Sequence, residues 1–172
     1  MTPGAQVLIA KEGSVIYQKS FGYHTYEKIR KVNNDDIYDL ASLTKILVTV
    51  PLIIREFEKN NLSLSTKLKD LFTDFELHDK KNLKLDEILS HNARLTPWIP
   101  FYKETLDSVT NKQLEDQYSY NKTETFNIQV REGLFMKSWN DTIFNRIINS
   151  KLLEKKEYKY SDLPYYLLKK YL

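Results

Sequence analysis

A serine and a lysine three residues apart lie directly before a long apolar run, and this segment constrains the chain more than any other. Ser42 and Lys45 precede the run Ile46-Leu47-Val48-Thr49-Val50. If the run is helical, positions i and i+3 share one face, with Cβ atoms about 5–6 Å apart. A lysine amine can then reach the serine hydroxyl, as a serine nucleophile with a lysine base requires. On these four residues alone, a simple helix N-cap at Ser42 is the open alternative.

The same spacing occurs a second time in the chain, so its context matters. Ser119 and Lys122 are also three residues apart, but they lie among polar residues and tyrosines. Ser42 instead opens an apolar run with helical spacing. The context therefore favours Ser42 over Ser119 as a candidate nucleophile.

Composition describes an ordinary globular chain and excludes several kinds of site. The 172 residues suffice for one domain with a core. The 26 basic and 23 acidic residues leave a net charge of +3, too even a balance to indicate nucleic acid or an anionic membrane as a partner. The chain has no cysteine, and its three scattered histidines have no metal-ligand spacing, so no metal site is predicted. No apolar stretch reaches the roughly 18–20 residues of a membrane span.

The N-terminal part predicts a strand hairpin followed by an interrupted helix. Residues 5–10 and 15–21 read as strands around a turn at residues 11–14. A helix is expected over residues 42–60, ending at Asn60-Asn61. Pro51 lies inside it, and an internal proline costs about 3 kcal/mol in a regular helix. Either a kink or two separate helices is therefore expected.

The remainder predicts mainly helices and loops. A short helix is expected within residues 83–91 and another over 139–148, with a turn and a last helix within 158–168. Residues 105–127 read as an irregular polar surface. Two prolines flank Trp98, which is expected to pack against the body of the fold, with a pocket-rim role as the alternative. The predicted class is α+β, an antiparallel hairpin plus a mainly helical region in a single domain over residues 1–172.

Four stretches in this order resemble the serine β-lactamase and penicillin-binding protein superfamily, in particular its class C-like group. They are the hairpin from Gly4 to Tyr23 and the runs Leu40-Ala41-Ser42-Leu43-Thr44-Lys45, Ser90-His91-Asn92-Ala93-Arg94-Leu95 and Tyr160-Ser161-Asp162. The chain is also similar to the β-lactamase-like module fused behind a family 3 glycoside hydrolase in some bacteria. That likeness rests on residues 38–42, 97–102 and 158–163.

The resemblance implies roles for four residues and no cofactor. Ser42 is the acylated nucleophile, and its backbone N–H forms half of an oxyanion hole. Lys45 takes the hydroxyl proton, with a pKa depressed by burial and positive neighbours. Tyr160 passes a proton to the leaving group. Asp162 is a substrate-binding residue. His91 lies outside this set and is expected to be a structural loop residue rather than a catalytic one.

This chain departs from the family pattern in three places. Asp162 stands where the family more often has asparagine, and an ionised carboxylate accepts hydrogen bonds but cannot donate them. Arg94 stands where glycine is usual, which strains the backbone if φ is positive there. The family's Lys/His-Ser/Thr-Gly triplet is absent, and Gly133 is the only glycine after position 22.

These features lead to the expectation of an N-terminal portion of a serine hydrolase, truncated before the strands that close the family's sheet. A hairpin without sheet neighbours and an inactive fragment are both expected. The parent reaction is acyl transfer from an amide or ester to Ser42, then hydrolysis, of the D-alanyl carboxypeptidase, β-lactamase or esterase type.

The expected partners of the parent are cell-wall-like peptides, amides or esters, with a possible fused glycoside hydrolase domain and no nucleic acid. The family implies a periplasmic or extracellular parent. The alternative from another class is a non-catalytic binding or scaffold module that retains the penicillin-binding fold.

Overall fold

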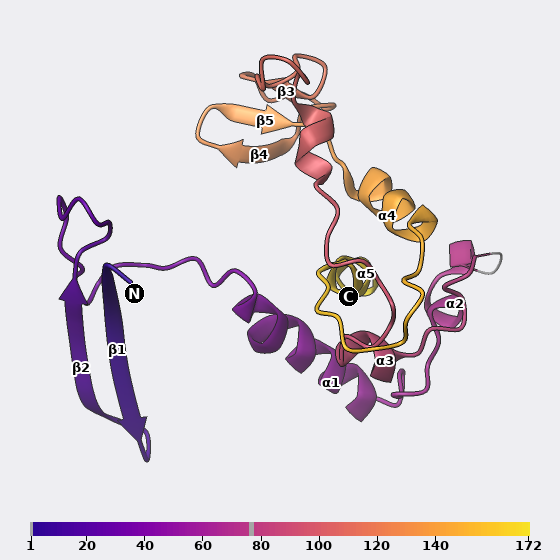
Figure 1. Ribbon diagram of the computed structural model, residues 1–172, viewed down its shortest axis with the longest axis horizontal. Helices are drawn as coiled ribbons and strands as arrows, with labels where there is room; N and C mark the ends of the chain where they lie inside the picture. The colour runs from indigo at the N-terminus through magenta and orange to yellow at the C-terminus, as the bar shows by residue number, and fades with distance from the viewer. Residues whose placement is uncertain (1, 76–77) are drawn as a thin grey trace. The chain divides into compact units, whose positions relative to one another are not determined.

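The computed structural model describes residues 2–75 and 78–172. The chain divides into two compact units, Met1–Ser42 and Leu43–Leu172. The first unit is built on strands and the second mainly on helices, so the predicted mixture of helix and strand is confirmed (Figure 1). Within the described ranges, no helix combines the length and apolarity needed to cross a bilayer.

The predicted N-terminal hairpin is confirmed. Strands β1 (Gly4–Lys11) and β2 (Ser14–Gly22) pair antiparallel (Figure 1). The two turn residues between them, Glu12 and Gly13, have φ values of 51° and 78°. A two-residue turn of this kind needs positive φ at both central positions, because its twist then matches that of the strands.

Two glycines face each other at the base of the hairpin, where there is no room for a side chain. Gly4 and Gly22 are register partners. A Cβ on Gly4 would lie 2.4 Å from the Tyr23 carbonyl oxygen, and one on Gly22 would lie 2.2 Å from the Pro3 carbonyl oxygen. Gly22 also has a φ of +66°, a region that glycine enters without a steric penalty.

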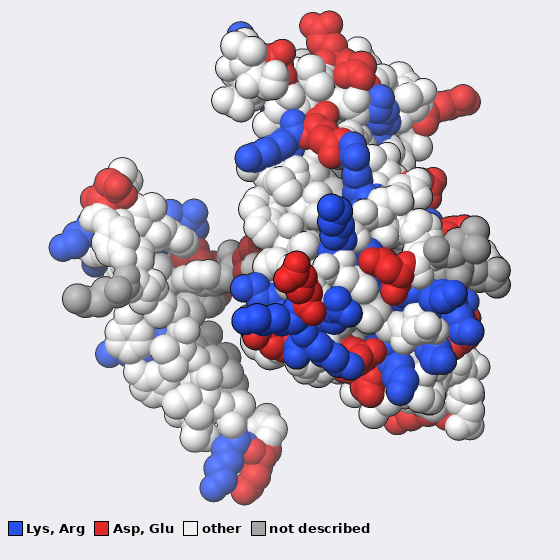
Figure 2. All heavy atoms as spheres, turned by 45° about the vertical axis from the view of Figure 1, so that its right-hand side comes forward, with Lys and Arg blue, Asp and Glu red and all other residues white. Residues whose placement is uncertain are grey.

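The hairpin has apolar side chains that remain in contact with solvent. Leu8 is 58% exposed and Ile16 is 64% exposed. Much of the hairpin surface visible in Figure 2 carries no charge. Among the described strands β1 and β2 pair only with each other.

A carboxylate organises the loop that follows the hairpin. Asp36 Oδ2 accepts from the Asn33 backbone N–H at 2.7 Å and lies 2.8 Å from His24 Nε2. Its Oδ1 accepts from Arg30 Nη2 at 2.6 Å. The Asn33 hydrogen bond is the main cause that holds the pKa of Asp36 below its usual range, opposed by desolvation and assisted by His24 and Arg30.

We expect this loop to loosen in acid. Because the pKa of Asp36 is depressed in the folded state, its contribution to stability is present above the unfolded-state pKa and is lost as pH falls through the folded-state pKa. The Asn33 amide resonance, followed by NMR from pH 6 to pH 2, should move with a midpoint below that of an ordinary aspartate. Asp36→Asn should remove this titration, while Asp35→Asn serves as the neighbouring control. A midpoint at or above the ordinary value would contradict the prediction.

The second unit begins with the interrupted helix, and the interruption takes a form that was not predicted. Residues Lys45–Thr49 form a π-helical turn, in which the Val50 N–H donates to the Lys45 carbonyl five residues back. Helix α1 (Val50–Glu58) follows with Pro51 in its first turn. Proline has no N–H and its ring crowds the carbonyl four residues back, so the wider turn relieves both problems. The helix ends at Glu58, and Asn60 two residues later has a φ of 60°, the left-handed conformation that closes many helices.

Several further elements complete this unit. The helices after α1 are α2 (Leu68–Leu71), the 3₁₀ turns Thr73–Phe75 and Phe101–Thr105, α3 (Leu85–Leu89), α4 (Asn140–Asn149) and α5 (Leu163–Tyr171). The expected helices within 83–91, over 139–148 and within 158–168 are confirmed as α3, α4 and α5, and Pro164 lies in the first turn of α5. Their apolar faces meet in one core, made of Ile53, Leu62, Leu68, Leu85, Ile88, Ala93, Leu95, Phe101, Phe144, Ile147, Ile148, Leu163, Leu167 and Leu168.

A small sheet in the second unit was missed by the sequence analysis. Strands β3 (Tyr118–Ser119), β4 (Ile128–Arg131) and β5 (Leu134–Met136) pair in the order β3-β5-β4. The available signal was the alternation Ile128, Val130 before Gly133, whose φ of +67° makes the turn. Residues 105–127 are otherwise irregular, as expected, apart from the 3₁₀ end and β3.

The backbone at Arg94 has the strained conformation that was anticipated for a residue in place of glycine. Its φ is +60°, a region that costs a non-glycine residue free energy. The surroundings hold it there, because Arg94 Nε donates to the Leu153 carbonyl at 2.6 Å and the Leu153 N–H donates to the Arg94 carbonyl at 2.7 Å.

Candidate active site

Ser42 is the last residue of the N-terminal unit and directly precedes Leu43, where helical conformation begins. The residue before it, Ala41, has a φ of 43°, and its N–H donates to Asp39 Oδ1 at 2.8 Å. Left-handed backbone at a non-glycine residue is strained, and such strain is often found at functional positions. The candidate nucleophile therefore follows a tight, strained turn at the start of a helix.

Lys45 points into a cluster of groups that come from the far end of the sequence. Its Nζ lies 2.6 Å from Asp162 Oδ1. The same Nζ lies 5.2 Å from the ring centroid of Tyr160 and 5.4 Å from that of Tyr165, within range of cation–π attraction. The Lys45 side chain is only 13% exposed. The second unit thus places two of the predicted catalytic residues, Lys45 and Tyr160, together with the predicted substrate-binding residue Asp162.

The predicted low pKa of Lys45 is wrong. Burial does lower the pKa of the Lys45 amine, but hydrogen bonds to Asp162 and Tyr160 and the charge of Asp162 outweigh burial. The net pKa therefore lies above the usual lysine value. The prediction did not take account of the Asp162 carboxylate, and a nearby anion stabilises the ammonium form of a lysine.

The segment that carries Tyr160 and Asp162 is fixed by hydrogen bonds to the loop after α3. The Lys159 N–H donates to the His91 carbonyl at 2.9 Å, and the Asp162 N–H donates to the Pro97 carbonyl at 2.8 Å. Between them, Ser161 is 1% exposed and its Oγ donates to the Thr96 carbonyl at 2.6 Å. Two short segments 65 residues or more apart in sequence are therefore joined at the site.

His91, which the sequence analysis predicted to be only a structural loop residue, takes part in this arrangement. Its ring centroid lies 4.5 Å from that of Tyr160 and 5.7 Å from that of Tyr165. Its Nδ1 accepts from the Ser161 N–H at 3.2 Å, so a neutral ring carries its proton on Nε2. Burial, and then the Lys45 ammonium, lower the pKa of His91, against a smaller opposing effect of Asp162. His91 therefore supports Tyr160 as a neutral aromatic platform.

Trp98 is not the packing residue that was expected, because it is 56% exposed. The two prolines on either side fix the backbone of the loop, and the Pro97 carbonyl accepts from Asp162, but the indole itself stays in solvent. Tyr160, at 41% exposed, is likewise open on one side.

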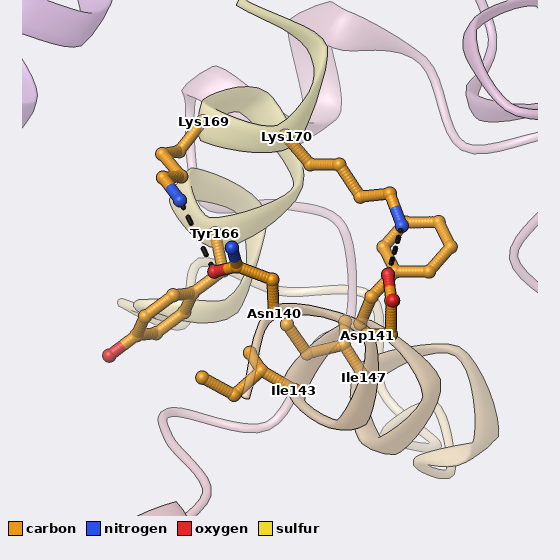
Figure 3. Close-up of a pocket in the computed structure, with 8 residues that line it drawn as sticks. Asn140, Asp141, Ile143, Ile147, Tyr166, Lys169 and Lys170 are labelled. Atoms are coloured by element: carbon orange, nitrogen blue, oxygen red, sulfur yellow. Dashed lines mark hydrogen bonds and ion pairs between the residues drawn. The ribbon is translucent and has the colours of Figure 1, made fainter. Parts of the chain in front are cut away.

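A cavity of about 540 Å³ lies between α4 and α5 (Figure 3). It shares no lining residue with the cluster around Lys45. Lys169 Nζ donates to Asn140 Oδ1 at 3.3 Å, and Lys170 pairs with Asp141 at 3.2 Å. Lys45, Tyr160 and Asp162 do not line it. The cavity is lined by Asn140, Asp141, Ile143, Phe144, Ile147, Tyr166, Lys169 and Lys170.

The chain is similar to curated bacterial proteins and to a β-lactamase of known structure. It is 28% identical over 113 residues to Protein flp of Staphylococcus aureus (strain MRSA252), covering 64% of this chain and 22% of that protein. It is 26% identical over 102 residues to Penicillin-binding protein 4* of Bacillus subtilis (strain 168), covering 59% of this chain and 22% of that protein. The chain therefore spans about a fifth of the length of these relatives.

A solved structure shares the fold across nearly the whole chain. The class C β-lactamase of Rhodobacter sphaeroides superposes with a TM-score of 0.63 at 19% identity, over 99% of this chain and 38% of that one. The described elements thus correspond to part of a β-lactamase fold. The family model "Beta-lactamase" matches residues 1–169, and the chain therefore belongs to the β-lactamase family, within the serine β-lactamase and penicillin-binding protein superfamily.

Proposed function

We propose that this chain carries the acylation residues of a serine hydrolase, with Ser42 as nucleophile, Lys45 as base and Tyr160 as the proton donor to the leaving group. One observation carries the proposal: Lys45, one turn after Ser42, lies 5.2 Å from the ring of a tyrosine 115 positions away in the sequence. Family membership supports the same reading, because the β-lactamase family model extends over residues 1–169.

The proposed reaction is acyl transfer from an amide or ester. Ser42 Oγ attacks the carbonyl carbon while its proton passes to the neutral Lys45 amine. The carbon–nitrogen or carbon–oxygen bond then breaks, and the leaving group receives a proton through the Tyr160 hydroxyl. Water hydrolyses the resulting Ser42 ester and regenerates the hydroxyl.

The proposed substrates are small peptides, amides or esters of the cell-wall type. Asp162 would meet the substrate with acceptors only, which favours N–H donors over carbonyl groups. The Lys/His-Ser/Thr-Gly triplet is absent from these 172 residues, so we propose that they turn over substrate slowly on their own. A fused glycoside hydrolase in the parent stays a prediction from resemblance.

The second candidate function is a binding or scaffold module without catalysis. The Lys45–Asp162 ion pair favours it, because an amine held as ammonium cannot accept the serine proton. The absent triplet favours it as well.

Covalent labelling tests the first candidate against the second. Incubation with a fluorophosphonate, followed by peptide mass spectrometry, should give slow phosphonylation at Ser42 and none in Ser42→Ala. Ser119→Ala is the matched control, because Ser119 has the same spacing to a lysine, and it should label like the parent chain. Labelling that survives Ser42→Ala, or that never reaches Ser42 after long incubation, contradicts the assignment. Rapid labelling would contradict only the expected slow turnover.

A further inference from the structure

The surroundings of the Lys45 amine stabilise its charged form from several sides. The Asp162 carboxylate lies 2.6 Å away, and two aromatic faces lie at 5.2 and 5.4 Å. An anion at contact distance and electron-rich ring faces each attract an ammonium ion more strongly than a neutral amine. The titratable groups around Lys45 are Asp162, Tyr160, Tyr165 and His91.

None of these four side chains carries a positive charge that would destabilise the Lys45 ammonium. His91 is kept neutral by burial and by Lys45 itself, which lower its pKa, and its Nδ1 is occupied by the Ser161 N–H. Burial raises the pKa of Tyr165, with the Lys45 ammonium acting against it. Of the groups that raise the pKa of Lys45, Asp162 contributes most, followed by Tyr160.

The position of the carboxylate is set by the fold rather than by Lys45. The Asp162 backbone N–H is bonded to the Pro97 carbonyl, and Asp162 is the residue before α5, whose Leu163 N–H donates to Ser161 Oγ at 3.2 Å. A substitution that removes only the charge should leave this backbone in place, because none of these bonds uses the Asp162 side chain.

We propose that Asp162 is a positioning residue that holds Lys45 as an ammonium ion and so keeps the base for Ser42 in its inactive, protonated form. This rests on the proposed function for the catalytic step, although the ion pair itself does not. The site then has a built-in dependence on pH. The ion pair is present at pH values below the unfolded-state lysine pKa and is lost as pH rises through the elevated folded-state pKa of Lys45. Acylation by Ser42 is expected to rise over the same alkaline range.

Titration of Lys45 itself tests the proposal without relying on activity. The Lys45 side-chain resonances, assigned by comparison with Lys45→Arg, are followed by NMR as pH is raised in the parent chain and in Asp162→Asn. The asparagine variant should titrate at lower pH than the parent. Asp141→Asn, which removes a carboxylate paired with Lys170, is the matched control and should leave the Lys45 midpoint unchanged. Equal Lys45 midpoints in the parent chain and in Asp162→Asn overturn the proposal.

The rate of Ser42 phosphonylation provides the second measurement. At pH 7 Asp162→Asn should label on the order of tenfold faster than the parent, because more of its amine is neutral, and the two rates should converge at high pH. Identical pH profiles would overturn the role of Asp162 in controlling the base. A shifted Lys45 titration with no Ser42 labelling in any variant would instead refute the proposed function and leave the ion pair intact.

Discussion

Lys45→Met is expected to lower the rate of Ser42 phosphonylation by about 10²- to 10⁴-fold, measured at alkaline pH, where the parent chain is expected to label fastest. Methionine fills the space of the lysine stem but offers no amine to accept the serine proton. The residual rate then reflects attack by an unassisted hydroxyl. Labelling with a fluorophosphonate and peptide mass spectrometry measures the ratio.

Lys45→Arg distinguishes a base from a fixed positive charge. Arginine can keep an ion pair with Asp162, but it does not release its proton in proteins. If Lys45 is the base, the arginine variant should be as slow as the methionine variant. Lys122→Met, in the second serine–lysine tetrapeptide, is the control and should label at the parent rate. An arginine variant that labels like the parent would show that charge alone is needed.

Lys80→Met is expected to lower the free energy of unfolding of the second unit by about 2–4 kcal/mol. Lys80 is fully buried, and its Nζ donates to the Ile148 carbonyl at 2.9 Å and also to the Ser150 carbonyl. These carbonyls lie at the C-terminal end of α4, where a cation is favourable. Its third contact is Asp79 at 2.9 Å. Methionine preserves the packing but leaves the two carbonyls without this donor.

Urea unfolding followed by tryptophan fluorescence measures the loss, since Trp98 and Trp139 both belong to the second unit. Lys81→Met changes the neighbouring, exposed lysine and should shift stability by less than about 0.5 kcal/mol. A midpoint for Lys80→Met equal to that of Lys81→Met would mean that the buried ammonium contributes no net stability.

The parts of the fold that the sequence predicted correctly depend on residues that are close together in the sequence. The turn at Glu12-Gly13 and the two strands follow from local backbone preferences, and so does the end of the first helix shortly before Asn60. Pro51 predicted an interruption, but the π-helical turn before it was not foreseen. The sheet of β3, β4 and β5 was missed because its strands have two to four residues, too few to establish a period.

The amino-acid order indicated Ser42 and Lys45 by their spacing and context, and the resemblance of short motifs to a known family added Tyr160 and Asp162. Only the tertiary structure decided what surrounds the amine. Asp162 and Tyr160 meet Lys45 because the segment before α5 is bonded to the loop after α3. The charge state of a buried lysine depends on such neighbours in space, which is why the sequence predicted a lowered pKa and the structure gives a raised one.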